Sequence, residues 1–198
     1  MSENRLTFDE VSHTYHYDGV QIPNVTSVIA PLSDYSRVPA HIMAHAQQRG
    51  TAVHKACELY LLNDLDETSL DETVAPYFYQ FVKFMRESGF SCEHSELRVF
   101  HSRLRYAGTL DLAGDLNRCH SLIDLKTPIV MNPATGPQTA AYEDAYRDML
   151  GIRKSKRIKR FGLKLQPDHY ELIPFEDSND INVFMAMKTL YHWKESNS

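Results

Sequence analysis

Cysteine is scarce in this sequence, and its spacing excludes several kinds of small protein. Only three of the 198 residues are cysteines, at positions 57, 92 and 119, and none lies in a CxxC pair. An odd number of distant cysteines does not build a disulfide framework, a structural zinc site or an iron–sulfur cluster. We therefore expect reduced thiols, as in a cytosolic protein.

Long apolar runs and an excess of positive charge are also absent. No segment approaches the ~18 apolar residues of a membrane-spanning helix, and the opening MSENRLTFDE contains no signal-peptide core. With 21 Lys and Arg against 26 Asp and Glu, the formal net charge is −5, so the whole molecule is not drawn to nucleic acid or anionic membranes. We expect a soluble cytoplasmic protein without a membrane partner, in which any phosphate-binding surface is local.

What the sequence does contain indicates one globular domain. An apolar fraction of 42% beside 24% charged residues is typical of globular proteins. A chain of 198 residues fits a single domain, because most domains hold about 100–200 residues. We predict an accessory β-hairpin within residues 1–30, a core over 37–175 and a C-terminal helix over 179–195.

Helix and strand periodicities alternate along this core. Apolar residues recur at helical spacing over 39–63, where Gly50 is expected to separate two helices, and over 74–87, 137–149 and 179–195. Strand-like segments are expected over about 96–101, 106–116, 121–126, 159–165 and 169–174. This order predicts an α/β fold with a central mixed β-sheet flanked by helices on both faces.

One strand-like segment carries the most informative polar residues. Side chains alternate along a strand, so Asp124 and Lys126 share one face while Ile123 and Leu125 lie on the apolar face. Asp111 precedes them at a distance suited to a hairpin that places it beside Asp124. Adjacent carboxylates repel unless they share a proton or a cation, and Mg²⁺ or Mn²⁺ with a lysine alongside is equipped to hydrolyse phosphodiesters. The alternative is a surface hairpin with an ordinary ion pair.

Four short blocks in a fixed order connect these residues with others along the chain. They are RGTAVHKACE around His54, AGTLD ending at Asp111, IDLKT with Asp124 and Lys126, and QTAAY with Gln138 and Tyr142. The set resembles the PD-(D/E)XK nuclease superfamily, specifically its RecB-like and phage-type exonuclease branch. Small phage recombination exonucleases and mitochondrial genome maintenance exonucleases have similar GTLD, IDxKT and QxxAY blocks. The resemblance covers about half of the chain and implies a restriction-endonuclease-like core.

The resemblance also implies a role for each matching residue. The catalytic residues would be Asp111, Asp124 and Lys126. One or two Mg²⁺ or Mn²⁺ ions would be bound by His54, Asp111, Asp124 and the Leu125 carbonyl, and the substrate would be flanked by Gln138 and Tyr142. Without the other blocks, His54 and Tyr142 would be interpreted as packed core residues.

Several charged residues outside these roles are further candidates. Glu58 shares a helix face with His54, and Glu96 lies on a strand before GTLD; each is either an acid behind the metal ligands or a surface charge. The basic run RKSKRIKR, residues 153–160, contains six cations. It suggests a DNA-backbone patch or a solvated loop, and its candidate DNA-binding residues are Arg153, Lys154, Lys156 and Arg157.

The expected function is a divalent-metal-dependent exonuclease that hydrolyses phosphodiester bonds at the ends of single- or double-stranded DNA. The resemblance implies a role in phage or bacterial recombination or repair, a bacterial or phage-infected cytoplasm, and a recombination or single-strand-binding protein as a candidate partner. The oligomeric state stays open. One alternative is a structure-specific or restriction-type endonuclease of the same superfamily, and another is a DNA-binding homologue that does not cleave.

Overall fold

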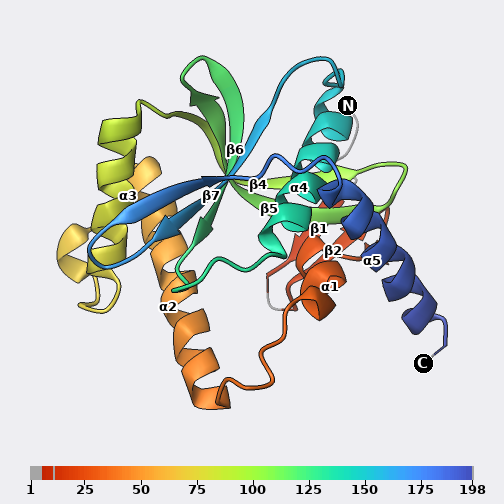
Figure 1. Cartoon of the computed structure of the whole chain (residues 1–198), viewed down its shortest axis with the longest axis horizontal. Helices are drawn as coiled ribbons and strands as arrows, with labels where there is room; N and C mark the ends of the chain where they lie inside the picture. The colour runs from red at the N-terminus through yellow and green to blue at the C-terminus, as the bar shows by residue number, and fades with distance from the viewer. Residues whose placement is uncertain (1–5, 11, 198) are drawn as a thin grey trace.

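A computed structural model describes residues 6–10 and 12–197, which form two β-sheets with surrounding helices (Figure 1). The strands are β1 (Leu6–Asp9), β2 (Thr14–Tyr17), β3 (Val20–Ile22), β4 (Ser91–His101), β5 (Tyr106–Leu116), β6 (Cys119–Lys126), β7 (Lys159–Leu165) and β8 (Tyr170–Pro174). The helices are α1 (Val25–Ile29), α2 (Ala40–Leu61), α3 (Ala75–Ser88), α4 (Thr135–Leu150) and α5 (Asp180–Glu195). Within these residues, no helix combines the length and the apolar character needed to cross a membrane.

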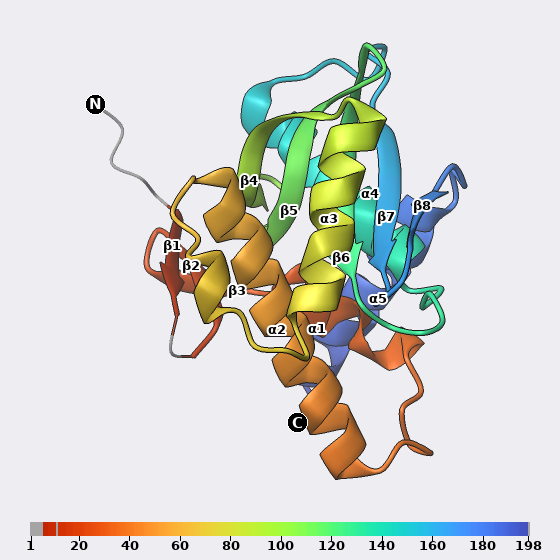
Figure 2. The ribbon, with the colours of Figure 1, turned by 90° about the vertical axis from the view of Figure 1, so that its left-hand side faces the viewer.

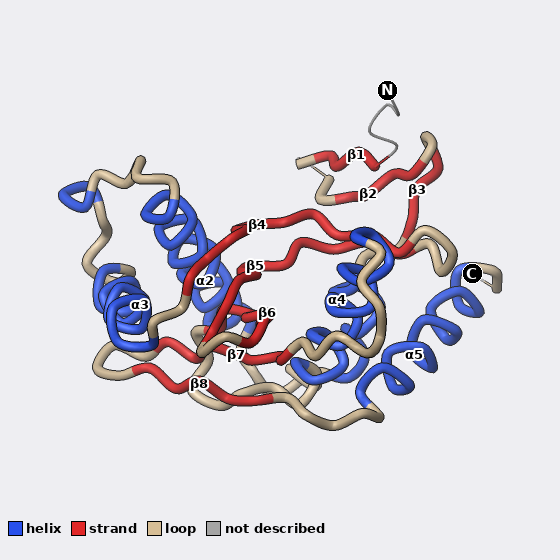
Figure 3. The backbone as a smooth tube through the Cα atoms, turned by 90° about the horizontal axis from the view of Figure 1, so that it is seen from above, coloured by secondary structure: helices blue, strands red, loops and turns tan. Residues whose placement is uncertain are grey.

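The larger sheet has the strand order β4-β5-β6-β7-β8. Its neighbouring strands are antiparallel except for β6 and β7, which are parallel, and a parallel pair needs a crossover connection, here α4. α2 and α3 lie on one face of the sheet, and α4 and α5 lie on the other (Figure 3). The predicted α/β fold with a mixed, helix-flanked sheet is therefore confirmed.

The N-terminal accessory is a three-stranded antiparallel sheet instead of a two-stranded hairpin. β2 and β3 are joined by Asp18 and Gly19, both with a positive φ, of 52° and 74°. Two such residues form the tight turn that best fits the twist of paired strands, so this part of the expectation is correct. A hydrogen bond of 2.6 Å between the hydroxyls of Tyr15 and Thr109 joins this small sheet to β5.

The helix break expected at Gly50 is wrong. α2 runs without interruption from Ala40 to Leu61, although an internal glycine costs about 1 kcal/mol relative to alanine. A Cβ at position 50 would lie 3.4 Å from the Thr127 hydroxyl oxygen. This is near ordinary contact distance, so α2 passes close to the end of β6 here. The first turns of α2 lie mostly in solvent and extend beyond the rest of the fold (Figure 2).

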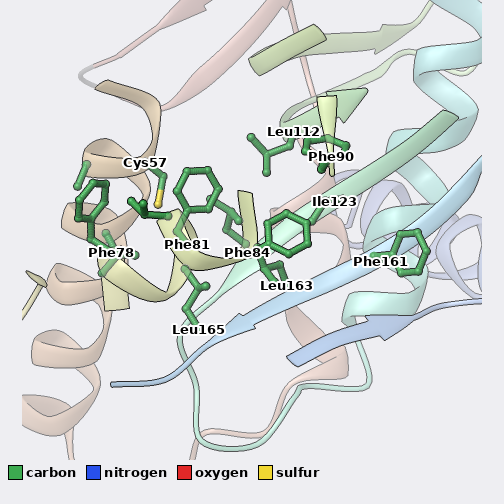
Figure 4. Close-up of a cluster of buried hydrophobic side chains, with 14 of the residues drawn as sticks. Cys57, Phe78, Phe81, Phe84, Phe90, Leu112, Ile123, Phe161, Leu163 and Leu165 are labelled. Atoms are coloured by element: carbon green, nitrogen blue, oxygen red, sulfur yellow. The ribbon is translucent and has the colours of Figure 1, made fainter. Parts of the chain in front are cut away.

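Aromatic side chains of α3 fill the core on one face of the sheet (Figure 4). Phe78, Phe81 and Phe84 are fully buried, and they recur at the three-residue spacing that places side chains on one helix face. They belong to one cluster with Ile123 of β6 and Leu163 of β7. The other face has a second core, where α4 presents small alanines that allow close packing against the sheet. The two cores fix the strands between them.

Candidate active site

The polar site lies where the pairing between β5 and β6 ends. The two strands pair from Leu116 and Cys119 as far as Leu112 and Ile123. Beyond this point β6 continues to Lys126 with β7 as its paired neighbour. The Leu125 N–H donates instead to Oδ2 of Asp111, at 2.5 Å. The Asp111 carboxylate thus takes the place of a backbone partner at the fork between the strands.

Asp124 and Lys126 leave β6 on the same face and meet. Asp124 is 2% exposed, and its Oδ2 is in contact with the Lys126 ammonium. Burial and the neighbouring charge of Asp111 raise the pKa of Asp124 to about 6, against the opposing effect of Lys126. Burial alone would lower the pKa of Lys126, but Asp124 and Asp111 raise it above its ordinary value. The lysine is therefore a permanent cation beside two acids.

His54 reaches the fork from α2. The flanking Val53 and Cys57 are buried in the core below α3, which orients this face of the helix toward the sheet. The ring nitrogen Nδ1 lies 3.5 Å from Asp111 Oδ1, and Nε2 donates to the Leu125 carbonyl at 3.0 Å. Burial opposes the charged ring, but Asp111 outweighs it and raises the pKa of His54 to about 9. His54 and the Leu125 carbonyl are thus adjacent at the fork.

Glu96 is the acid that completes this group. Its carboxylate, the His54 ring and the Asp111 carboxylate each offer a ligand atom, and these three atoms lie within 4.8 Å of one another. Burial and Asp111 raise the pKa of Glu96 to about 7. Glu96 has a left-handed φ of 50° in the middle of β4, a conformation that costs a non-glycine residue about 1 kcal/mol or more. The pairs Ser95–Leu112 and Leu97–Leu110 flank this interruption opposite Asp111.

Glu58 lies at the rim of the site. Its carboxylate accepts a hydrogen bond of 2.8 Å from the Lys55 ammonium, one helical turn away. The charge of Glu58 contributes to the raised pKa of Glu96, after burial and Asp111. Glu58 is thus a neighbouring charge held by a surface lysine, whereas Glu96 belongs to the inner group.

α4 brings Gln138 and Tyr142 to the same fork from the opposite face. The Gln138 side-chain amide donates to the Tyr142 hydroxyl at 3.1 Å, and both residues are buried. Burial, followed by the charges of Asp124 and Asp111, raises the pKa of the Tyr142 hydroxyl, so the phenol stays protonated. A Cβ at Gly108 would lie 2.6 Å from the Tyr142 ring. The glycine therefore allows this ring to lie against β5.

Two further residues near the site carry no signal in the sequence blocks. The Thr26 hydroxyl of α1 hydrogen-bonds to Tyr142. The Tyr35 hydroxyl accepts a hydrogen bond of 2.8 Å from the Asn132 side-chain amide. Burial lowers the pKa of Lys126, and Tyr35 adds to the opposing effect of the two acids. Both residues come from the segment between β3 and α2, which only the tertiary fold brings to the end of β6.

The structure does not bring the basic run to the fork. Arg153, Lys154, Lys156 and Arg157 are exposed and precede the start of β7, which pairs with Ser121 at the start of β6. Five strand residues separate this level from Lys126, a distance of about 17 Å at 3.3 Å per residue. Within the same run, Arg160 is buried and forms ion pairs with Asp180 and Glu143, so its role is structural.

Comparisons of the chain with protein-family models and with curated protein sequences find no match. The chemistry of the residues at the fork is therefore the basis for proposing a function.

Proposed function

We propose that this chain is a divalent-metal-dependent deoxyribonuclease of the PD-(D/E)XK type that hydrolyses phosphodiester bonds at DNA ends. The observation that carries the proposal is the convergence of His54, Asp111, Asp124 and Lys126 at the β5–β6 fork. These side chains come from α2, β5 and β6, and two of them are acids buried beside each other. Two buried acids beside each other are costly for a merely structural role, which favours a functional one.

The donor set at the fork fits a hard divalent cation. Asp111 and Glu96 offer carboxylate oxygens within 4.8 Å of a His54 ring nitrogen, and the Leu125 carbonyl lies 3.0 Å from His54 Nε2. Once His54 loses its proton, this set is suited to Mg²⁺ or Mn²⁺. Asp124 stands outside this group of atoms; its Oδ2 faces the Lys126 ammonium, so this acid holds the lysine beside the group. The high pKa values of Asp124 and Glu96, about 6 and about 7, reflect crowded carboxyl groups whose ionised forms a cation would stabilise.

The residues around the fork divide the chemistry among them. A bound Mg²⁺ or Mn²⁺ supplies an acidified water and polarises a phosphoryl oxygen. Lys126, permanently charged and about a quarter exposed, stabilises the negative charge that develops on the phosphate. Tyr142 and Gln138 are hydrogen-bonded to each other and line the fork opposite α2, where the neutral phenol adds no negative charge next to the acids.

The preference for DNA ends rests on the similarity of the four sequence blocks to exonucleases. An endonuclease of the same superfamily would use the same acids and lysine. Covalently closed circular DNA separates the two, because an exonuclease has no end at which to begin. A non-cleaving homologue would bind DNA without hydrolysing it.

The testing experiment incubates the protein with linear DNA labelled at the 5′ or the 3′ end, with Mg²⁺, with Mn²⁺ or with a chelator, and follows product length over time. We expect stepwise shortening that stops with the chelator and that leaves closed circles intact. Lys126→Ala should reduce kcat by about 10²–10³-fold, as loss of one charge-stabilising donor does, with DNA binding retained. Lys83→Ala, a change at an exposed position of α3, is the matched control.

Three results would count against the proposal as it stands. Turnover by Lys126→Ala at the wild-type rate would remove the lysine from the chemistry. Cleavage of closed circles would replace the exonuclease with an endonuclease. Binding of DNA without any hydrolysis, with every divalent ion tried, would favour the non-cleaving homologue.

A further inference from the structure

Two consecutive apolar side chains beside the candidate active site are almost fully exposed. Ile129 is 82% exposed and Val130 is 78% exposed, more than any other large apolar side chain of residues 6–10 and 12–197. They follow Lys126 by only three and four residues. Exposed β-branched side chains do not contribute the hydrophobic free energy that burial would give. Their position next to the fork therefore suggests that a bound molecule covers them.

The segment that carries them is anchored on both sides. The Pro128 carbonyl accepts a hydrogen bond of 2.8 Å from the Gln166 side-chain amide. On the other side, the Asn132 amide donates to the Ser33 hydroxyl at 2.6 Å and to the Tyr35 hydroxyl at 2.8 Å. The tip formed by Ile129 and Val130 is therefore fixed in place while its side chains remain in solvent.

Tyr35 extends the same apolar surface. Tyr35 is 52% exposed, and its hydroxyl is bound to Asn132, which lies six residues after Lys126 in the segment that carries Ile129 and Val130. We call Tyr35, Ile129 and Val130 the apolar rim. The segment TPIVMNPAT, residues 127–135, contains no Lys or Arg, so it offers apolar contact and no charge for phosphate.

We propose that the apolar rim receives nucleobases of the DNA strand whose backbone lies at the β5–β6 fork, so that the strand is gripped by its bases next to the bond that is cut. This inference rests on the proposed function. Three residues of chain reach at most about 10 Å, which is about three stacked bases at 3.4 Å per nucleotide. Apolar and aromatic side chains bind base faces without sequence preference, and such side chains also insert between base steps.

The size of the rim favours bases over a protein partner. A specific protein interface buries about 800 Å² on each partner, far more than two aliphatic side chains and one ring present. A base has a flat apolar face that such a small surface can cover. The proposal therefore predicts contact with unstacked bases at the end of a strand, within about three nucleotides of the scissile bond.

The test combines a protein variant with a substrate variant. Ile129→Ser/Val130→Ser removes the rim's aliphatic surface at two exposed positions, and Leu62→Ser, at a residue 59% exposed at the end of α2, is the matched control. Oligonucleotides carry one abasic position at each of the three nucleotides nearest the scissile bond. Fluorescence anisotropy in Ca²⁺ measures binding, and product formation in Mg²⁺ measures kcat/KM.

We expect the double variant to bind intact DNA about 5- to 150-fold more weakly, the range for loss of one stacked base, with an unchanged melting temperature. An abasic position that weakens binding to the wild type should weaken binding to the double variant little or not at all. The proposal would be overturned if the abasic position weakened binding by the same factor in the double variant as in the wild type. It would also be overturned if the double variant bound intact DNA as tightly as the wild type, or if Leu62→Ser weakened binding equally.

Failure of the rim and failure of the proposed function are distinguishable. If the wild type binds the oligonucleotides but does not cleave them, the nuclease proposal fails while the anisotropy comparison still decides the role of the rim. If the wild type binds none of them, both proposals fail together. If the wild type binds and cleaves and the rim variant binds and cleaves equally well, only the rim proposal fails.

Discussion

Gly108→Ala is expected to disturb both the fold and the site, because it places a methyl group against Tyr142. The added Cβ would lie 2.6 Å from Tyr142 Cε1 and 3.3 Å from a Val25 methyl, whereas favourable carbon contacts begin near 3.5 Å. Tyr142 is only 4% exposed, so its ring cannot turn into solvent to make room. A displacement of about 1 Å follows from the difference between these distances.

The magnitude can be worked out from two opposing effects. Overpacking a buried site lowers the free energy of unfolding by about 1–3 kcal/mol. Replacing glycine by alanine in an extended strand raises it by about 0.4–1 kcal/mol, because alanine restricts the unfolded chain. The net loss is about 1–2 kcal/mol, or a melting temperature lower by about 2–8 °C for a chain of this size. If the chain is a nuclease, kcat should also fall by up to about 10²-fold, since catalytic geometry tolerates little displacement.

The assay is a double-mutant cycle measured by urea unfolding. Tyr142→Leu removes the ring atoms that collide with the new methyl, so Gly108→Ala should cost much less in that background, with a coupling free energy of at least about 1 kcal/mol. Tyr142→Phe keeps the ring and should give no such relief, which makes it the control. Strictly additive effects of Gly108→Ala and Tyr142→Leu would refute the packing argument.

Two further predictions concern regions away from the fork. Asp148 Oδ2 accepts hydrogen bonds from the Ser102 N–H and hydroxyl at 2.8 and 2.6 Å. Burial raises the pKa of Asp148, but these bonds outweigh it and lower the pKa below 3.8. Asp148→Asn should therefore reduce the free energy of unfolding by about 1–2 kcal/mol at pH 7. A carboxyl group whose pKa is lower in the folded state stabilises the fold at pH values above its unfolded-state pKa, and this stabilisation is lost as the pH falls through its folded-state pKa. In urea unfolding, the difference in stability between wild type and Asp148→Asn should therefore shrink below about pH 4. A difference that stays constant with pH would contradict the assignment. Changing Arg153, Lys154, Lys156 and Arg157 to alanine should reduce the slope of log K against log salt by up to about 3 on long single strands. It should leave cleavage of oligonucleotides shorter than about five nucleotides unchanged, since about 17 Å separates them from Lys126; an unchanged slope on long DNA would exclude these cations from the binding surface.

The parts of the site that sequence predicts are those set by local geometry. Alternation along one strand is enough to put Asp124 and Lys126 on one face, and a hairpin of suitable length is enough to bring Asp111 beside them. The apolar spacing over 74–87 predicts a helix for the same reason, because helical periodicity is a local property, and the buried aromatic face of α3 agrees with it. The structure agrees on each of these positions.

Other parts depend on tertiary contacts that no local pattern contains. Gly50 looks like a helix break, but α2 continues through it as one helix beside Thr127. Glu96 joins the inner group through a left-handed residue within a strand, and strand propensities do not anticipate such a conformation. Tyr35 reaches Asn132 from a loop far away in sequence, so only the folded chain reveals it.

The place of the basic run follows from topology more than from composition. Because β6 and β7 are parallel, α4 must return the chain to the end of the sheet where β6 begins. A segment just before β7 therefore lies at the opposite end from Lys126, whatever its charge. The run follows Gln138 and Tyr142 closely in sequence, but α4 has 16 residues and is about 24 Å long. It therefore carries the chain away from these two residues before the run begins.

The hydrogen bond from Leu125 to the Asp111 carboxylate means that one acid belongs to the scaffold and to the chemistry at once. A side chain that completes the bonding of a strand is positioned by folding itself, with no separate adjustment after the sheet has formed. Evolution or an engineer could exchange surrounding loops and alter what the molecule acts on. The acid would be much harder to relocate, since moving it would leave a buried amide without its acceptor.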